Sequence, residues 1–325
     1  MLTKQVDSSV TPREQNDPVS VSQCTSDPGT DYPRQSSDTR VSSALDSLAN
    51  SVNATTPQDP TAESLKPLGR EHPTHCRIMV MTPERVLYVG LLGQPTVRTL
   101  GAVTIYFSLG SPFFLRTDDG RWNQHEYAML LPYVSHQVTT TDKLIGVILI
   151  EPETINLDRL CDLYGQPETM SSLSVIAHRA CAIHDNLKQE SPDSISDNHT
   201  FDMNVFGEDL QPRPLDPRIK TIAHRINEAP QDQWLAEQCA ESVSLSFSRF
   251  LHLFKQELKV PFRAFVAWKR ARSLLRYVSH TSNLTNIALE IGYPDATHFS
   301  HSIRKAYGLK PKDIFAGSRS LVLYR

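Results

Sequence analysis

The sequence predicts a multidomain chain in which an all-β barrel is followed by an all-α domain of two similar helix pairs joined by a long helix. Residues 71–165 hold short apolar runs separated by Gly/Pro turns, a pattern typical of sandwiches and barrels. Residues 216–325 show helical periodicity throughout. Charge divides the chain in a similar way. Residues 71–215 carry 10 Lys/Arg against 18 Asp/Glu, whereas residues 216–325 carry 17 against 9.

The first 70 residues are expected to form a disordered tail, because they are rich in Ser, Thr, Asp and Pro and show no apolar period. No signal peptide is visible, and the most apolar run, Leu144 to Ile150, is too short to span a bilayer. The 5 cysteines form no Cys-x-x-Cys pair, which argues against a disulfide scaffold or a structural zinc site. We therefore expect a cytoplasmic protein.

Four apolar or β-branched runs are expected to be strands of the barrel. They are residues 85–92, 103–109, 126–131 and 144–150. Turn sequences with Gly or Pro separate them at residues 93–95, 110–112 and 118–120.

An amphipathic helix is expected within residues 166–190. Its apolar side chains recur at intervals of three and four, which places them on one stripe. They are Leu173, Ile176, Ala180, Ile183 and Leu187. The stripe fits either a short dimerisation seam or a helix packed on its own domain, and the sequence leaves both open. Residues 191–215, with Pro, Gly and several acids, are expected to be a linker.

The helical domain begins at Asp216, a good N-cap that Pro217 follows at the first helical position. A first helix-turn-helix pair is predicted at about residues 232–258, where Ser246 caps the second helix. In that helix Phe250 and Phe254 are expected to point inward.

The same pattern recurs at about residues 283–307. Asp295, Phe299 and Ile303 stand 49 residues after Ser246 and its two inward phenylalanines. Between the two copies, residues 261–278 are predicted to form one long helix.

One stretch of the second pair carries a long, ordered motif. It is Ile287–His301, IALEIGYPDATHFSH, followed by Ala306–Pro311, AYGLKP. The motif resembles the signature of the AraC/XylS family of transcription regulators: Ile-Ala, then Gly-Phe, then Phe-Ser-Arg, then Gly-x-x-Pro. Ser248–Phe254 and Val260–Phe262 resemble the first copy. For residues 216–325 the resemblance implies a DNA-binding domain of seven helices, in which the third and sixth read DNA.

Three positions depart from the family pattern. His301 stands where Arg is usual, so one base or phosphate contact is expected to be weaker or different. Tyr293 replaces Phe, a small change. Lys259 stands where Gly308 sits in the second copy, and a non-Gly residue in a left-handed cap costs about 1 kcal/mol. We therefore expect the turn at Lys259 to differ.

The outward faces of the two reader helices are expected to contact DNA. The expected DNA-binding residues are Ser248, Arg249, Leu251, His252, Lys255, Thr297, His298, Ser300, His301, Arg304 and Lys305. Family geometry places some of them at base edges, namely Ser248, Leu251, His252, Thr297, Ser300 and His301. The cations are expected at phosphates, which position the protein without specifying sequence. A solvated helical face is the alternative for any one side chain. The long helix also carries Arg263, Lys269, Arg270, Arg272 and Arg276. We expect most of these to be solvated or ion-paired.

The middle domain has a weaker resemblance. Glu126–Gln137, EYAMLLPYVSHQ, is an apolar strand, a Pro turn and a His, and it resembles the second strand motif of a cupin-like barrel. The resemblance implies a domain that senses a small molecule or dimerises. Only His136 is present where a metal-dependent cupin needs several ligands, with His125 eleven residues earlier. We expect no catalytic residue, metal or cofactor.

The resemblance implies a sequence-specific transcription regulator and not an enzyme, and the sequence leaves both activation and repression of its targets open. The expected partners are double-stranded promoter DNA, RNA polymerase, a small-molecule effector of the barrel and a second copy of the chain, with no membrane. A regulator without an effector, controlled by its abundance or by a protein partner, fits the sequence as well.

Overall fold

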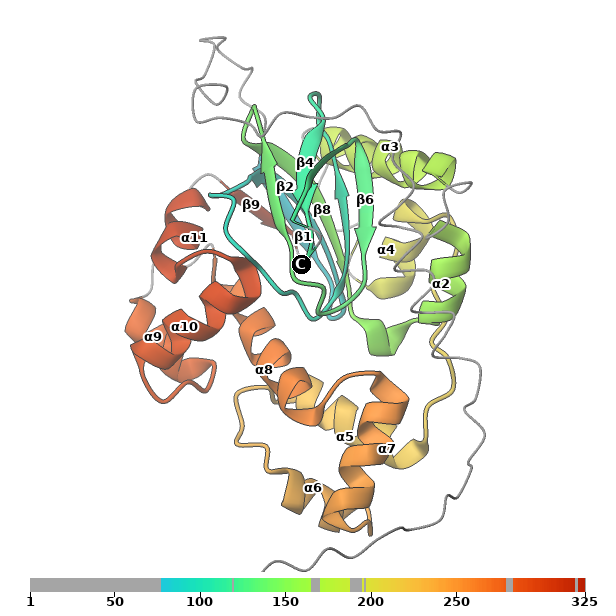
Figure 1. Cartoon of the computed structure of the whole chain (residues 1–325), viewed down its shortest axis with the longest axis vertical. Helices are drawn as coiled ribbons and strands as arrows, with labels where there is room; N and C mark the ends of the chain where they lie inside the picture. Colours follow the sequence, from blue (N-terminus) through green and yellow to red (C-terminus); the bar gives the residue numbers. More distant parts are fainter. Residues whose placement is uncertain are drawn as a thin grey trace, which may run out of the picture.

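The computed structural model describes residues 77–118, 120–164, 170–187, 195, 197–278, 283–318 and 321–324. The tail expected over residues 1–70 lies outside these ranges. Figure 1 shows a β-rich part at the top and a helical part below it and to the left. The last strand of the chain, β9 (Leu321–Tyr324), lies within the β-rich part beside the first, β1 (Arg77–Met81).

The β-rich part consists of two open sheets. The other strands are β2 (Arg85–Leu91), β3 (Val103–Phe107), β4 (Phe113–Arg116), β5 (Trp122–His125), β6 (Tyr127–Leu130), β7 (Gln137–Thr140) and β8 (Leu144–Ile150). The six-stranded sheet has the order β6-β3-β8-β2-β1-β9, and the three-stranded sheet has the order β5-β4-β7. Neighbouring strands are antiparallel except β1 and β9, which are parallel.

The expected order of a β-rich part followed by a helical part is confirmed, but the closed barrel is wrong. The strand β1 pairs with β2 on one side and with β9, the last strand of the chain, on the other, so β6 and β9 are the edges of an open sheet. Because β9 follows the helical part in sequence, no pattern within residues 71–165 could reveal this pairing. The four runs predicted to be strands are present as β2, β3, β6 and β8.

Different layers cover the two faces of the six-stranded sheet. Side chains alternate along a strand, so neighbouring residues of β1 enter different buried clusters. Ile78 lies in a cluster with α2 (Leu157–Tyr164), α3 (Met170–Asn186) and α4 (Asn198–Val205). Met79 faces the other side, where it lies in a cluster with helices from the end of the chain.

The apolar stripe of α3 faces the sheet. Its members are buried in the first of these clusters, namely Leu173, Ile176, Ala180, Ile183 and Leu187. The stripe is therefore part of the core and not a free dimerisation seam. Of the two interpretations that the sequence left open, the helix packed on its own domain is the one observed.

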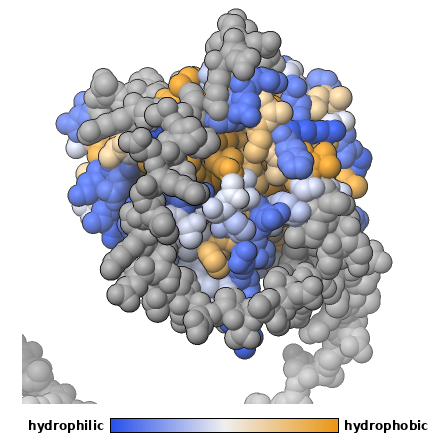
Figure 2. Space-filling view, turned by 90° about the horizontal axis from the view of Figure 1, so that it is seen from above, coloured by the Kyte–Doolittle hydropathy of each residue, from blue (hydrophilic) through white to orange (hydrophobic). Residues whose placement is uncertain are grey.

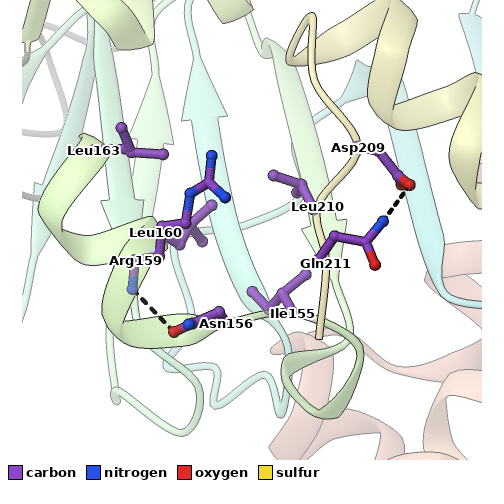
Figure 3. Close-up of a pocket in the computed structure, with 8 residues that line it drawn as sticks. All are labelled: Ile155, Asn156, Arg159, Leu160, Leu163, Asp209, Leu210 and Gln211. Carbon is purple, nitrogen blue, oxygen red and sulfur yellow. Dashed lines mark hydrogen bonds between the residues drawn. The ribbon is translucent and has the colours of Figure 1, made fainter. Parts of the chain in front are cut away.

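The segment expected to be a linker is built into the same face. It contains α4, whose Phe201 is fully buried. Asp202 of α4 forms a buried ion pair with Arg85 of β2, with 2.8 Å between Oδ1 and Nε. Further along, the carbonyl of Gln211 accepts a hydrogen bond from the backbone N–H of Asn156 (2.8 Å), beside the crevice drawn in Figure 3. These contacts fix the segment on the β-rich part.

Side chains fill the space between the two sheets. The buried side chains of this cluster are those of Leu92, Tyr106, Phe113, Leu115, Ala128, Val138 and Ile145. His136 is buried beside them, and its Nδ1 lies 2.9 Å from the carbonyl oxygen of Val134, so this nitrogen carries the proton and donates it. Nε2 then accepts from the hydroxyl of Tyr106 (2.9 Å). His136 is thus a hydrogen-bonded core residue.

The described helical part contains seven α-helices. They are α5 (Pro217–Glu228), α6 (Ala236–Ser242), α7 (Phe247–Leu258), α8 (Phe262–Arg272), α9 (Leu284–Glu290), α10 (Ala296–Tyr307) and α11 (Pro311–Gly317). As expected, Asp216 caps α5, because its side chain accepts from the N–H of Arg218 (2.9 Å). The long helix predicted over residues 261–278 is shorter, since α8 gives way to a 3-10 helix, η4 (Ser273–Tyr277).

The helices α7 and α10 end in the same way. Lys259 has φ 58° and Gly308 has φ 72°, so both caps are left-handed and the prediction that the turn at Lys259 would differ is wrong. The buried Val260 and Phe262 that follow hold the chain in this turn despite the missing glycine. At Gly308 an added Cβ would lie 2.7 Å from Oγ1 of Thr96, so this position has no room for a side chain.

Acidification is expected to destabilise the fold through His136. Burial is the largest cause that lowers its pKa from 6.5 to about 4, so the unfolded chain binds a proton here before the folded chain does. Stability should fall as the pH drops from about 6.5 to about 4, by about 3 kcal/mol in all. Urea unfolding at pH 7 and about pH 4.5 measures this in the intact chain and in His136→Gln, which does not titrate. An equal loss in both proteins would contradict the assignment.

The two caps of α7 and α10 are expected to respond oppositely to substitution. Lys259→Gly removes a strained left-handed residue and should raise the free energy of unfolding by about 0.5–1 kcal/mol. Gly308→Ala adds both strain and a clash with Thr96, and should lower it by more than about 1 kcal/mol. Urea unfolding of the two variants gives both values, and a gain in stability for Gly308→Ala would show that the packing at Thr96 is not as described.

Candidate nucleic-acid interface

The helical part contains two helix pairs, α6 with α7 and α9 with α10, and the second helix of each pair is capped as the sequence predicts, whereas α6 starts after Leu235 without a side-chain cap. The side chain of Ser246 accepts from the N–H of Arg249 (3.4 Å) at the start of α7. At the start of α10, Oδ1 of Asp295 accepts from the N–H groups of Thr297 (2.7 Å) and His298 (2.8 Å). The second cap therefore satisfies two of the backbone donors that a helix start leaves free.

The turn between the helices is one residue longer in the second pair. Residues 243–245 lie between α6 and Ser246, the cap of α7, and residues 291–294 lie between α9 and Asp295, the cap of α10. Ser244 (φ 55°) and Gly292 (φ 85°) supply the left-handed residue of each turn. An added Cβ at Gly292 would lie 2.1 Å from the carbonyl oxygen of Gln231, so this turn packs closely on the loop before α6.

The inward faces of α7 and α10 are apolar, as predicted. Phe250 and Phe254 are fully buried, and both meet the ring of Phe262 edge-on, at 5.4 and 5.2 Å between centroids. On α10, Phe299 and Ile303 are buried in the same way. These contacts decide which face of each helix points outward.

The structure places all the predicted site residues on the outward faces of α7 and α10. The exposed ones are Ser248, Arg249, His252, Lys255, Thr297, His298, His301, Arg304 and Lys305. Leu251 and Ser300 are half-buried at the margins of the two faces. Each face combines hydroxyl, imidazole and cationic groups, which can donate to or accept from base edges and pair with phosphates.

One of these side chains is engaged within its own helix. The Nδ1 of His298 lies 2.8 Å from Oδ2 of Asp295. The backbone N–H of His298 is the largest cause that lowers the pKa of Asp295, followed by its imidazole. His298 is therefore held over the start of α10, with Nε2 left to face outward.

A buried charge cluster, which the sequence analysis missed in part, holds α8 on the sheet. Glu151, just after β8, accepts from Nε1 of Trp268 (3.0 Å) and forms ion pairs with Lys269 and with Nε of Arg272 (2.7 Å). Burial raises the pKa of Glu151, but the two cations outweigh this and hold it below its usual value. The expectation of ion-paired cations on the long helix is thus met by Lys269 and Arg272, while no local pattern singles out Glu151.

A loop of the β-rich part contacts the end of α10. The N–H of Thr99 lies 3.0 Å from the carbonyl oxygen of Lys305 and 3.2 Å from that of Ala306. The hydroxyl of Thr96 donates to the carbonyl of Gly308. This loop therefore satisfies carbonyl groups that the last turn of a helix leaves without partners.

Within the ranges that the structure covers, no cluster of three or more His, Cys, Asp or Glu side chains could hold a metal ion. None of the helices in those ranges is long and apolar enough to cross a membrane.

Comparison with known proteins finds similarity in the helical part. A family model described as a helix-turn-helix domain matches residues 239–317. An uncharacterized HTH-type transcriptional regulator of Haemophilus influenzae is 27% identical over 114 residues, which cover 35% of this chain and 38% of that protein. The arabinose operon regulatory protein of Salmonella typhimurium is 28% identical over 120 residues, 35% of this chain and 41% of that protein. The transcriptional activator RhaS of Salmonella paratyphi B is 31% identical over 99 residues, 28% and 35% of the two chains. Each match spans less than half of the relative.

Two solved structures are similar at lower identity. Apo ToxT from Vibrio cholerae has a TM-score of 0.49 and 9% identity, and the match covers 72% of this chain and 97% of that one. The C-terminal domain of AraT from Geobacillus stearothermophilus has a TM-score of 0.31 and 24% identity, covering 32% and 88%. The family model and the sequence relatives thus agree that the carboxy-terminal part of this chain is similar to the helix-turn-helix domain of transcription regulators, among them the arabinose operon regulatory protein and RhaS.

Proposed function

We propose that the chain is a sequence-specific DNA-binding transcription regulator of the AraC/XylS type, with tandem helix-turn-helix motifs that read one duplex. The observation that carries the proposal is the equivalence of α7 and α10. Both helices have a capped start, an apolar inward face, a left-handed end and a polar, cationic outward face. In a helix-turn-helix the second helix lies in the major groove.

The outward residues divide into two roles. Ser248, Leu251 and His252 of α7 and Thr297, Ser300 and His301 of α10 are proposed to read base edges. Hydroxyl and imidazole groups hydrogen-bond there, and Leu251 meets a thymine methyl. Arg249, Lys255, Arg304 and Lys305 are proposed to bind phosphates. His298, whose Nδ1 is engaged with Asp295, contributes its Nε2 alone.

The arrangement of the two readers supports a site with two half-sites. The helix α8 and its extension η4 lie between the motifs, and α8 is fixed to the sheet through Glu151. Readers held in this way suit adjacent major-groove segments on one face of the duplex, about 34 Å apart. One chain then suffices for both half-sites.

The β-rich part is proposed to modulate DNA binding through a small-molecule effector or a second copy, and the complex is proposed to act on RNA polymerase as an activator. Figure 2 looks onto the upper end of the β-rich part, where apolar residues are exposed beside polar ones. Such a surface suits an apolar ligand better than a charged one. A homodimer would have to use a surface other than the buried stripe of α3.

The experiment that tests the function is selection of the full chain against random duplex DNA, with sequencing at two salt concentrations. The proposal expects an enriched motif with two half-sites about one helical turn apart. Binding that depends on salt alone and enriches no sequence would show a phosphate-binding surface without readout, and would refute the proposal.

Substitutions on α10 should separate readout from phosphate binding. His301→Ala is expected to relax base preference at one position of the second half-site, with a loss of about 1–3 kcal/mol on the selected sequence. Arg304→Ala should weaken binding to all sequences alike and reduce the salt slope by about one. Lys143→Ala removes an exposed cation from the β-rich part as the matched control and should change neither. The assignment of roles fails if the first two variants behave alike.

A further inference from the structure

We propose that the six-stranded sheet supports the second reader helix, α10, by sharing a buried core with it, and that pairing of β9 with β1 holds the sheet and α10 together. The inference rests on the proposed function, because it concerns how one of two half-sites is read. It places the boundary between the two packed cores inside the helical part, between α7 and α10. The first motif then has one core, and the second motif shares the other with the sheet.

The two helix pairs pack into different cores. The core of the first pair has buried members from Ile219 to Val266, all in the helical part, and the half-buried Tyr133 touches it from the β-rich part. The core of the second pair also includes six buried side chains of the β-rich part. They are Met79, Met81, Val86, Leu100, Ala102 and Leu149. Without the sheet, one side of this shared core would face water, which is unfavourable for apolar side chains.

The strand β9 carries the second pair into the sheet. Just before it, the carbonyl of Gly317 accepts from Nη1 of Arg77 in β1 (3.3 Å). Leu321, opposite Arg77 in the parallel register, is buried in the shared core. Tyr324 packs on the other face of the sheet, where its hydroxyl donates to the carbonyl of Leu187 (3.0 Å). The strand is therefore anchored on both faces.

Polar contacts attach the second reader itself to the β-rich part. Thr99 and Thr96 hydrogen-bond to the end of α10, and Glu151 binds the end of α8 that leads to the second pair. The helix α5, which packs on the first pair, has its own link to the β-rich part, since Nδ2 of Asn227 donates to Oε1 of Glu153 (3.0 Å). Among the described residues, the first pair shares no strand with the sheet. Any event that loosens β9 from β1 should therefore affect the second half-site first.

The test deletes residues 319–325 from the full chain, which removes β9, and measures binding to the selected DNA and to DNA with either half-site scrambled. We expect the deletion to weaken binding to the intact site about 10- to 100-fold. On DNA whose second half-site is scrambled, the deleted and intact chains should bind equally. Amide hydrogen exchange should speed up in α9 and α10 and stay unchanged in α5 and α7.

Point variants guard against a general loss of folding. Leu321→Ala, at a side chain 8% exposed, should give a smaller effect in the same direction. Val322→Ala, on the same strand but 41% exposed, should give none. Equal losses at both half-sites with Leu321→Ala, or no loss with the deletion, would overturn the inference.

The exchange measurement separates this inference from the proposed function. If the intact chain selects no DNA sequence, the proposed function fails. Faster exchange confined to α9 and α10 after the deletion would still support the role of β9 in holding these helices on the sheet. Unchanged exchange in α9 and α10 after the deletion would refute this role of β9, even if the intact chain reads two half-sites.

Discussion

A buried carboxylate fixes where the helical part sits on the sheet. Glu151 is 2% exposed and lies between Lys269 and Arg272 of α8, which are buried as well. Charges removed from water are stable only when paired, and deleting one partner of a buried pair typically costs about 3–5 kcal/mol. The cluster therefore forms only with α8 in this position. Because α8 joins the two helix pairs, its position constrains both of the proposed reader helices, α7 and α10.

From this common anchor the two readers differ in their support. The helix α7 rests on an aromatic core of its own motif, built around Phe254 and Phe262. The helix α10 rests on a core shared with the sheet, and a loop of the β-rich part satisfies its last carbonyl groups. A chain built in this way links the β-rich part physically to α10, and the modulation of DNA binding proposed above would act through these packed side chains.

Local patterns were enough to predict most of the helical part and both outward faces. The cap at Asp295 and the inward direction of Phe250 depend on residues a few positions away in the sequence, so a local pattern is enough to predict them. The features that were missed depend on distant partners. The edge of the six-stranded sheet depends on pairing between β9 and β1, which are far apart in sequence. The segment expected to be a linker is part of the core because Phe201 packs against the sheet. Glu151 has a structural role because the cations of α8 lie beside it. The sequence around Glu151 does not distinguish it from any other acidic residue at the end of a strand, so its pairing with α8 could not be predicted.

The claim that one rigid chain presents both readers is tested most directly by changing the spacing of the half-sites. Insertion of about five base pairs turns the second half-site to the opposite face of the duplex, and insertion of about ten restores the face but adds a full turn. The account predicts that the full chain loses the contribution of the second half-site, about 10- to 100-fold in affinity, with both insertions. Binding that recovers with the ten-base-pair insertion would contradict it, because the readers would then belong to flexibly joined units or to two copies of the chain.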